Sequence, residues 1–124
     1  MADKPVIARP TDARPIAAMG KVFGIAEWNG SGPPQLHVHY EDDEAWHILE
    51  GQVEFHFKDG MEVCGPGSTV FVPAGVAHTY VTANDANYLI VVTPRLRALI
   101  RELHETPPAD HPAVYRRHAS ELLE

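Results

Sequence analysis

Two histidines and a glutamate mark the ends of the segment HVHYEDDE, residues 37–44. Because side chains alternate along a β-strand, His37 and His39 would point to one side of a strand and Val38 to the other. Glu44 follows after a short turn, at the head of another apolar segment. Imidazole and carboxylate groups brought together in this way form a donor set that suits first-row transition metals. The segment therefore predicts part of a metal site.

His78 is the candidate for a further ligand of the same site. It follows the turn Pro73-Ala74-Gly75 and begins an apolar segment of its own. If that segment and the His37 strand are antiparallel neighbours, His78 lies beside His37 and His39. The other histidines have no partner at ligand spacing and are interpreted as structural or solvated: His47, His56, His104, His111 and His118.

The elements that must position these residues are short. Turn signals rich in Gly, Pro, Asn and Asp recur about every 8 to 12 residues in the middle of the chain, and segments rich in Val, Ile, Phe, Tyr and Trp lie between them. This spacing predicts an all-β sandwich or barrel. The expected strands are KVFGIAEW, QLHVHY, AWHILE, QVEFHFK, MEVCG, STVFVP, AHTYV and NYLIVV. The last of these is apolar on both faces, which indicates a buried strand or an interface.

The pattern changes after Thr93, which can cap a helix with Pro94 in its first turn. The apolar residues that follow repeat at the i, i+3, i+4, i+7 spacing of an amphipathic helix: Leu96, Leu99, Ile100 and Leu103. A weaker pattern, with Tyr115, Ala119 and Leu122 on one face, predicts a second helix over residues 113–123.

The 124 residues, 44% of them hydrophobic, suit a single domain. We expect an extended N-terminal segment over residues 1–15, a barrel over residues 16–93 and a helical tail over residues 94–124. The start of the chain, MADKPVIARP, lacks the apolar run of a secretory signal, and no stretch is long and apolar enough to span a membrane. The single cysteine, Cys64, is interpreted as a half-buried strand residue in a reducing compartment. A cytoplasmic protein is the prediction.

The net charge of −7 is concentrated in the middle of the chain. Residues 16–94 hold ten acidic residues against Lys21 and Lys58, whereas residues 95–124 are neutral. The acidic run at residues 41–43 is interpreted as a solvated turn that attracts cations. This distribution argues against nucleic acid as a partner and favours a small-molecule ligand.

The spacing of these residues resembles that of the cupin family, which carries two short motifs. The first, G(X)5HXH(X)3,4E(X)6G, is matched except that Ser31 stands where the leading glycine is expected; its matching residues are His37, His39, Glu44 and Gly51. The second, G(X)5PXG(X)2H(X)3N, is matched except that Thr82 replaces the final asparagine; its matching residues are Gly67, Pro73, Gly75 and His78. The two motifs span roughly residues 31–82, and the strand pattern continues to about residue 93.

The resemblance implies an antiparallel jelly-roll β-barrel that encloses one divalent transition-metal ion, such as iron, manganese, nickel or zinc. The implied ligands are His37, His39, Glu44 and His78. The tail VVTPRLRALIREL is also similar to that of quercetinase-like dioxygenases, so the resemblance favours an oxidoreductase of the dioxygenase type. In such an enzyme Glu44 would also accept a proton from the substrate, and Tyr80 would hydrogen-bond to it.

Two questions stay open at the level of sequence. Trp46, Phe55 and Tyr80 either fill the barrel or line a pocket for an aromatic or enolisable substrate. The chemistry is either oxidative, or that of a non-redox isomerase, lyase or cyclase, or the chain binds a small ligand without turnover. The two-sided apolar strand NYLIVV predicts a homodimer in each case.

Overall fold

The computed structural model describes residues 2–82 and 85–123, and these form ten short strands with a helical segment between the last two. The strands are β1 Ala17–Met19, β2 Gly24–Asn29, β3 His37–His39, β4 Glu44–Glu50, β5 Val53–Phe57, β6 Gly60–Cys64, β7 Thr69–Val72, β8 Thr79–Thr82, β9 Asn87–Val92 and β10 Ser120–Leu122. The helical segment comprises α1 Pro94–Glu105, a 3₁₀ turn η1 Pro108–Asp110 and α2 His111–Arg117.

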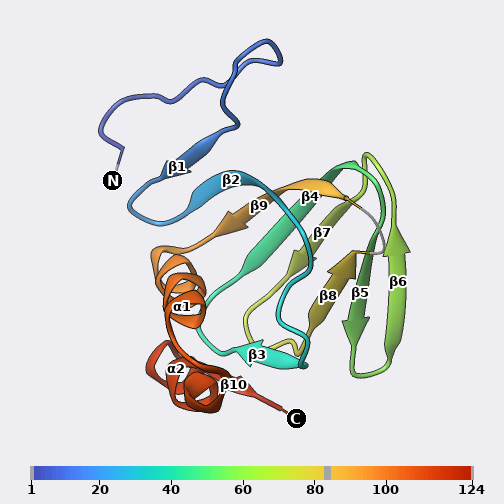
Figure 1. Ribbon diagram of the computed structural model, residues 1–124, viewed down its shortest axis with the longest axis vertical. Coiled ribbons are helices and arrows are strands. Elements are labelled where there is room, and N and C mark those ends of the chain that lie inside the picture. Colours follow the sequence, from blue (N-terminus) through green and yellow to red (C-terminus); the bar gives the residue numbers. More distant parts are fainter. Residues whose placement is uncertain (1, 83–84, 124) are drawn as a thin grey trace.

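The strands form an antiparallel jelly-roll barrel (Figure 1). One wall is a five-stranded sheet in the order β1-β2-β9-β4-β7, and the other is a three-stranded sheet in the order β6-β5-β8. β3 pairs with β10 in a separate two-stranded sheet, and an isolated bridge between His37 and His78 joins β3 to the chain that leads into β8. The predicted all-β architecture is confirmed.

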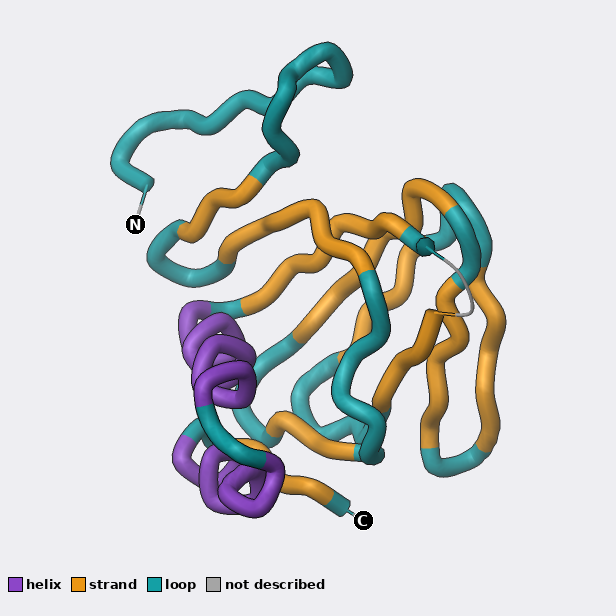
Figure 2. Tube along the Cα trace, viewed as in Figure 1, coloured by secondary structure: helices purple, strands orange, loops and turns teal. Residues whose placement is uncertain are grey.

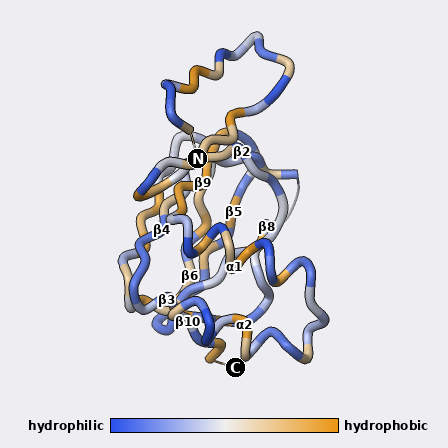
Figure 3. The backbone as a smooth tube through the Cα atoms, turned by 90° about the vertical axis from the view of Figure 1, so that its left-hand side faces the viewer, coloured by the Kyte–Doolittle hydropathy of each residue, from blue (hydrophilic) through white to orange (hydrophobic). Residues whose placement is uncertain are grey.

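Alternation along the strands places the core between the two walls. Val53 and Phe55 of β5 are buried while Glu54 and His56 are half-exposed, as expected for a strand with one face toward a core. The largest buried side chains come from both walls and from the tail: Trp46, Ile48, Phe55, Tyr88, Leu96, Leu99 and Tyr115. Figure 3 shows the hydrophobic stretches gathered around β4, β5 and β9.

The expectation that NYLIVV is buried on both faces is only partly right. In β9, Tyr88, Ile90 and Val92 face the core, whereas the alternate side chains of the strand are half-buried on the outer face of the five-stranded sheet. Both neighbours of β9, namely β2 and β4, are hydrogen-bonded strands, so its backbone is satisfied on both edges.

Helix α1 begins where the sequence predicts. The side-chain oxygen of Thr93 accepts a hydrogen bond from the backbone N–H of Leu96 at 3.2 Å, and Pro94 occupies the first turn. Leu96 and Leu99 are buried against the barrel. The two helices pack beside the end of the barrel that carries β3 (Figure 2).

The prediction of a helix over residues 113–123 is wrong for its second half. Helix α2 ends at Arg117, and Ala119 adopts a left-handed conformation with φ of 52°, which breaks the helical path. The chain then runs antiparallel to β3, with Ser120 opposite His39 and Leu122 opposite His37. The chain forms a short strand here rather than a helix, because the strand hydrogen-bonds to the backbone groups at the exposed edge of β3.

The segment before β1 lies away from the barrel and is tied to it by few contacts, one of them from the backbone N–H of Ala2 to the carbonyl of Met19 at 2.8 Å (Figures 1 and 2). Cys64 closes β6 and is half-buried, as predicted. Within the described residues, neither helix has the length and apolar character needed to cross a membrane.

Candidate metal centre and its cavity

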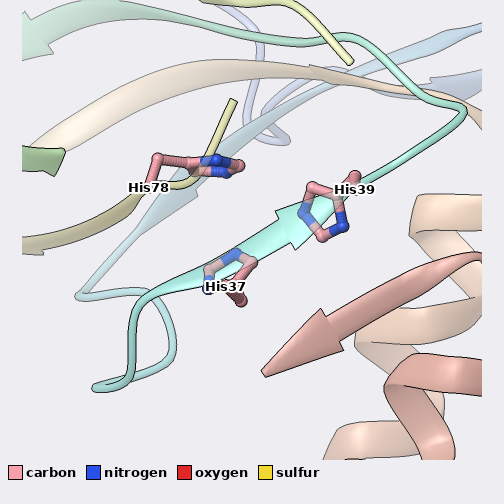
Figure 4. Close-up of side chains that lie close together, drawn as sticks. All are labelled: His37, His39 and His78. Atoms are coloured by element: carbon pink, nitrogen blue, oxygen red, sulfur yellow. The ribbon is translucent and has the colours of Figure 1, made fainter. Parts of the chain in front are cut away.

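Three histidines lie side by side at the end of the barrel near the helices. His37 and His39 come from β3, and His78 faces them from the chain that leads into β8 (Figure 4). All three are buried, with exposed fractions of 3%, 5% and 1%, and one nitrogen of each lies within 4.8 Å of the others. The structure thus brings together the three imidazoles that the sequence singled out.

A local backbone bridge fixes this arrangement. The N–H of His37 donates to the carbonyl of His78 at 3.1 Å, and the N–H of His78 donates to the carbonyl of His37 at 2.8 Å. This reciprocal antiparallel pair holds the two Cα atoms opposite each other, so both side chains leave the same face. His39 joins them because it is two residues further along β3.

Glu44 completes the cluster from the first residue of β4. Its Oε1 lies 3.1 Å from Nε2 of His78 and 3.4 Å from Nε2 of His39, and the side chain is 7% exposed. Glu44 shares its face of β4 with the buried residues Trp46 and Ile48, because side chains alternate along a strand. The four side chains expected at the site therefore converge from three separate elements.

Hydrogen bonds on the far side of the rings fix the tautomers of two histidines. Nδ1 of His37 lies 3.0 Å from the carbonyl of Gln35, and Nδ1 of His78 lies 3.0 Å from the carbonyl of Val76. A carbonyl oxygen only accepts, so each Nδ1 carries the hydrogen. When these rings are neutral, each Nε2 presents a lone pair to the cluster.

His39 is fixed in the same way by a side chain that the sequence did not point to. Its Nδ1 lies 2.8 Å from Oγ of Ser120, whose own hydroxyl donates to the carbonyl of His118 at 3.0 Å. With its hydrogen committed, the hydroxyl oxygen accepts from Nδ1 of His39. Ser120 belongs to β10, which the sequence had placed in a helix, so no pattern in the sequence could link it to His39.

Electrostatics at the cluster match the protonation states that metal ligands need. Burial, together with the neighbouring imidazoles of His78 and His39, lowers the pKa of His37 to about 3. Burial alone would raise the pKa of Glu44, but the imidazoles of His39 and His78 beside its carboxylate, when protonated, outweigh this and lower the pKa to about 2. Near neutral pH, His37 is therefore neutral and Glu44 is charged.

The cluster has the chemistry of a cation site. Three Nε2 lone pairs and a carboxylate oxygen meet in a buried space, and such a set is unfavourable unless a proton or a metal ion lies between them. A proton would satisfy one pair at a time, whereas a divalent ion could be held by all four groups. The residues present therefore fit the divalent transition metal that the sequence predicts.

A cavity of about 250 Å³ adjoins the cluster. His37, His39 and Glu44 form part of its lining, together with Tyr80 and Tyr115. The larger apolar side chains of the remaining lining come from β2, β9 and α1: Trp28, Ile90, Val92, Leu99, Ile100 and Leu103. A small molecule bound in this cavity would contact the candidate metal ligands directly.

Of the three aromatic residues considered for substrate contact, Tyr80 lines the cavity. Trp46 and Phe55 lie in the core, where their rings pack edge to face with centroids 5.1 Å apart, and they are absent from the described cavity lining. This packing agrees with the interpretation that both residues fill the barrel. A substrate contact for either residue stays a prediction.

The hydroxyl of Tyr80 is already engaged. It lies 3.1 Å from the hydroxyl of Tyr88, which donates its own hydrogen to the carbonyl of Gly30 at 2.8 Å. Tyr80 therefore donates to Tyr88 and keeps only its lone pairs for a ligand. Burial raises the pKa of Tyr80, so the group stays protonated at physiological pH.

Tyr115 is a site residue that sequence reasoning missed. It belongs to α2, its ring centroid lies 5.5 Å from that of His37, and it is 1% exposed. Its buried hydroxyl has no hydrogen-bond partner among the described residues. The sequence pattern placed Tyr115 only on an apolar helix face, because the contact between the tail and β3 arises from tertiary packing.

The remaining histidines lie outside the three-histidine cluster, although His104 and His111 line the cavity. Nδ1 of His47 lies 2.7 Å from Oγ1 of Thr69, and Nε2 of His118 lies 2.9 Å from a carboxylate oxygen of Glu102. His111 donates from Nε2 to the carbonyl of Leu103 at the end of α1. None of these belongs to the three-histidine cluster.

The family model for the cupin domain matches residues 25–93. The chain belongs to the cupin family. No curated protein matches the sequence.

Several solved structures share this fold. A cupin-2 domain containing protein from Shewanella frigidimarina is 23% identical, with 68% of this chain and 82% of that chain covered and a TM-score of 0.51. A conserved protein with a double-stranded β-helix domain from Klebsiella pneumoniae is 19% identical, with 70% and 78% covered and a TM-score of 0.54. A sugar phosphate isomerase of the cupin superfamily from Silicibacter pomeroyi is 28% identical, with 58% and 50% covered and a TM-score of 0.52.

Proposed function

We propose that this cupin is a metal-dependent enzyme that acts on a small molecule, with oxidation by dioxygen as its reaction type. The observation that carries the proposal is the convergence of three Nε2 atoms and the Glu44 carboxylate beside a largely apolar cavity. Four protein ligands leave coordination positions for a substrate with adjacent oxygens, such as an enol or a diol.

A divalent ion held by His37, His39, Glu44 and His78 would polarise a bound oxygen of the substrate and, if redox-active, couple its oxidation to dioxygen. The protein groups then have separate roles. The Glu44 carboxylate, ionised near neutral pH, accepts a proton from a substrate hydroxyl. The lone pairs of the Tyr80 hydroxyl orient a donor group of the substrate.

The test is elemental analysis of protein purified without chelators, followed by oxygen-uptake assays. Protein loaded in turn with iron, manganese and nickel is supplied with flavonols and other enolisable diols, and the His78→Ala variant is the matched control. We expect oxygen uptake in the native protein with at least one of these metals and little in the variant. The absence of oxygen uptake with all of these metals would refute the oxidative proposal.

A second candidate is a non-redox isomerase, lyase or cyclase in which the metal acts only as a Lewis acid. It is favoured by the likeness to the sugar phosphate isomerase, although that match covers half of the isomerase chain. Turnover that persists with zinc and without oxygen would select this candidate. A ligand that raises the melting temperature without forming a product would instead indicate a binding protein.

We also propose a homodimer formed by the outer face of the five-stranded sheet. A row of apolar side chains crosses all five strands on this face, where Ala18 pairs with Ile25, Ile25 with Val91, Val91 with Ala45, and Ala45 with Phe71. Phe71 is 63% exposed. Exposed apolar patches of this kind mark association surfaces.

Light scattering at micromolar concentration tests the dimer. We expect a dimer that Phe71→Glu dissociates, whereas Met61→Glu, an exposed position on β6 of the other sheet, leaves it intact. A monomeric native protein would refute the proposal.

A further inference from the structure

We propose that the cavity beside the candidate metal centre takes a small, largely apolar monocarboxylate, whose carboxylate is held by the guanidinium of Arg97. This inference deepens the proposed function, because it names the substrate class of the same site. It depends on that function only for turnover, since the carboxylate contact is independent of the metal.

Arg97 is the one Lys or Arg residue among the described residues that line the cavity. Its side chain is half-buried, and no carboxylate of the described chain lies within ion-pair distance of it. Two other arginines of the tail do have such a partner: Arg95 in α1 lies 3.6 Å from Asp42, and Arg117 in α2 lies 2.6 Å from Glu102. In a chain with a net charge of −7, a cation in a cavity without an acidic partner is available to an anionic ligand.

Helix α1 places Arg97 and apolar side chains on the face that lines the cavity. Arg97, Ile100 and His104 recur at i, i+3 and i+7, so they share one face of the helix, and all three line the cavity. A ligand on this face meets a guanidinium beside aliphatic side chains. A guanidinium presents two parallel N–H groups that match a carboxylate.

The charge of the site favours a single negative charge on the ligand. The other ionised group among the described lining residues is Glu44, which faces His39 and His78. Phosphate groups are usually bound by clusters of arginine and lysine rather than by one guanidinium. One cation in an acidic chain therefore suits a carboxylate better than a phosphate.

The size and lining of the cavity define the rest of the ligand. Its volume of about 250 Å³ is below the roughly 300–1,000 Å³ of pockets for drug-sized molecules. The apolar lining, which includes Trp28 and Leu103, suits an aromatic or branched aliphatic body. The hydroxyl of Tyr115, which has no partner among residues 2–82 and 85–123, offers a hydrogen bond to a further oxygen of the ligand.

The experiment compares matched probes by calorimetry on protein freed of metal by chelation and dialysis. The probes are 3-phenylpropanoate, its neutral amide 3-phenylpropanamide, and phenyl phosphate. The variants are Arg97→Gln and, as the matched control, Arg101→Gln, which removes an exposed arginine one turn further along α1 and outside the described cavity lining. Circular dichroism verifies that each variant is folded.

We expect the carboxylate to bind at least about tenfold more tightly than the amide, because a charge-assisted pair is roughly twice as strong as a neutral one. Arg97→Gln should abolish this preference without changing the affinity for the amide, and Arg101→Gln should leave both affinities unchanged. The proposal is overturned if the amide binds as well as the carboxylate, if phenyl phosphate binds more tightly, if the preference survives Arg97→Gln, or if no probe binds.

These outcomes separate the inference from the proposed function. A chain that binds no metal but shows the Arg97-dependent preference would refute the metalloenzyme and keep the carboxylate site. A chain that binds metal and consumes oxygen without this preference would do the opposite.

Discussion

Replacement of Ser120 by alanine removes the hydroxyl that fixes the tautomer of His39. In the native protein the Ser120 oxygen accepts a hydrogen bond from Nδ1 of His39 at 2.8 Å, which leaves the Nε2 lone pair for the metal. Without it, His39 can place its hydrogen on Nε2 and rotate, so part of the population cannot bind. Partners of this kind are worth about 10- to 100-fold in metal affinity, or about 1.4 to 2.7 kcal/mol at 1.4 kcal/mol per factor of ten.

The assay is competition for zinc between the protein and a chromogenic chelator, at a fixed pH and with the fold verified by circular dichroism. Ser120→Thr keeps a hydroxyl and should restore most of the affinity, and Ser68→Ala removes a hydroxyl from a distant turn and should have no effect. The ¹⁵N chemical shifts of the imidazole nitrogens supply a second readout, since they report the tautomer of His39 directly. Native affinity in a folded Ser120→Ala protein would show that the hydrogen bond does not organise the site.

Three further substitutions test other parts of the molecule. Glu44→Gln should weaken zinc binding at least about tenfold in the same competition assay, because it removes a charged ligand. The melting temperature of the metal-free protein should stay at the native value, since the amide can donate to Nε2 of His78. An unchanged zinc affinity would contradict this prediction. Tyr115→Phe should leave stability unchanged or raise it by about 1 kcal/mol in urea unfolding, because it removes a buried hydroxyl without a described partner; a loss above that size would show that the hydroxyl is satisfied. Gly32→Ala should destabilise by about 1–3 kcal/mol, because its Cβ would lie 2.5 Å from the Tyr80 ring; a neutral change would mean that the ring can move.

The strands and the histidine cluster were predictable because their signals are local. Alternation such as that of Val53 and Phe55 needs only neighbours in sequence, and the spacing of His37 and His39 fixes their common face. The strands β1 and β10 were missed, because their sequences, AAM and SEL, do not alternate between apolar and polar side chains. Their pairing is decided by which sheet edge is open.

The two departures from the cupin motifs illustrate the limit of reading residues one at a time. Ser31 stands in the place of a glycine and Thr82 in the place of an asparagine, and nothing in the sequence connects them. In the structure the backbone N–H of Thr82 donates to Oγ of Ser31 at 2.9 Å, and their hydroxyl oxygens lie 3.4 Å apart. The two departures are therefore in contact, and a substitution at one position bears on the other.

The family match ends at residue 93, whereas the site does not. The barrel contributes the four candidate ligands, but Arg97, Tyr115 and Ser120 come from the tail, and each acts on a different property: ligand charge, a polar anchor and the tautomer of His39. β10 pairs with β3, so the tail is held against the strand that carries two of the ligands. If barrel residues determine which metals bind and tail residues determine which molecules are recognised, substitutions in the two regions should have separate effects. Changes at His37 or Glu44 would alter metal content, and changes at Arg97 would alter ligand preference at constant metal content.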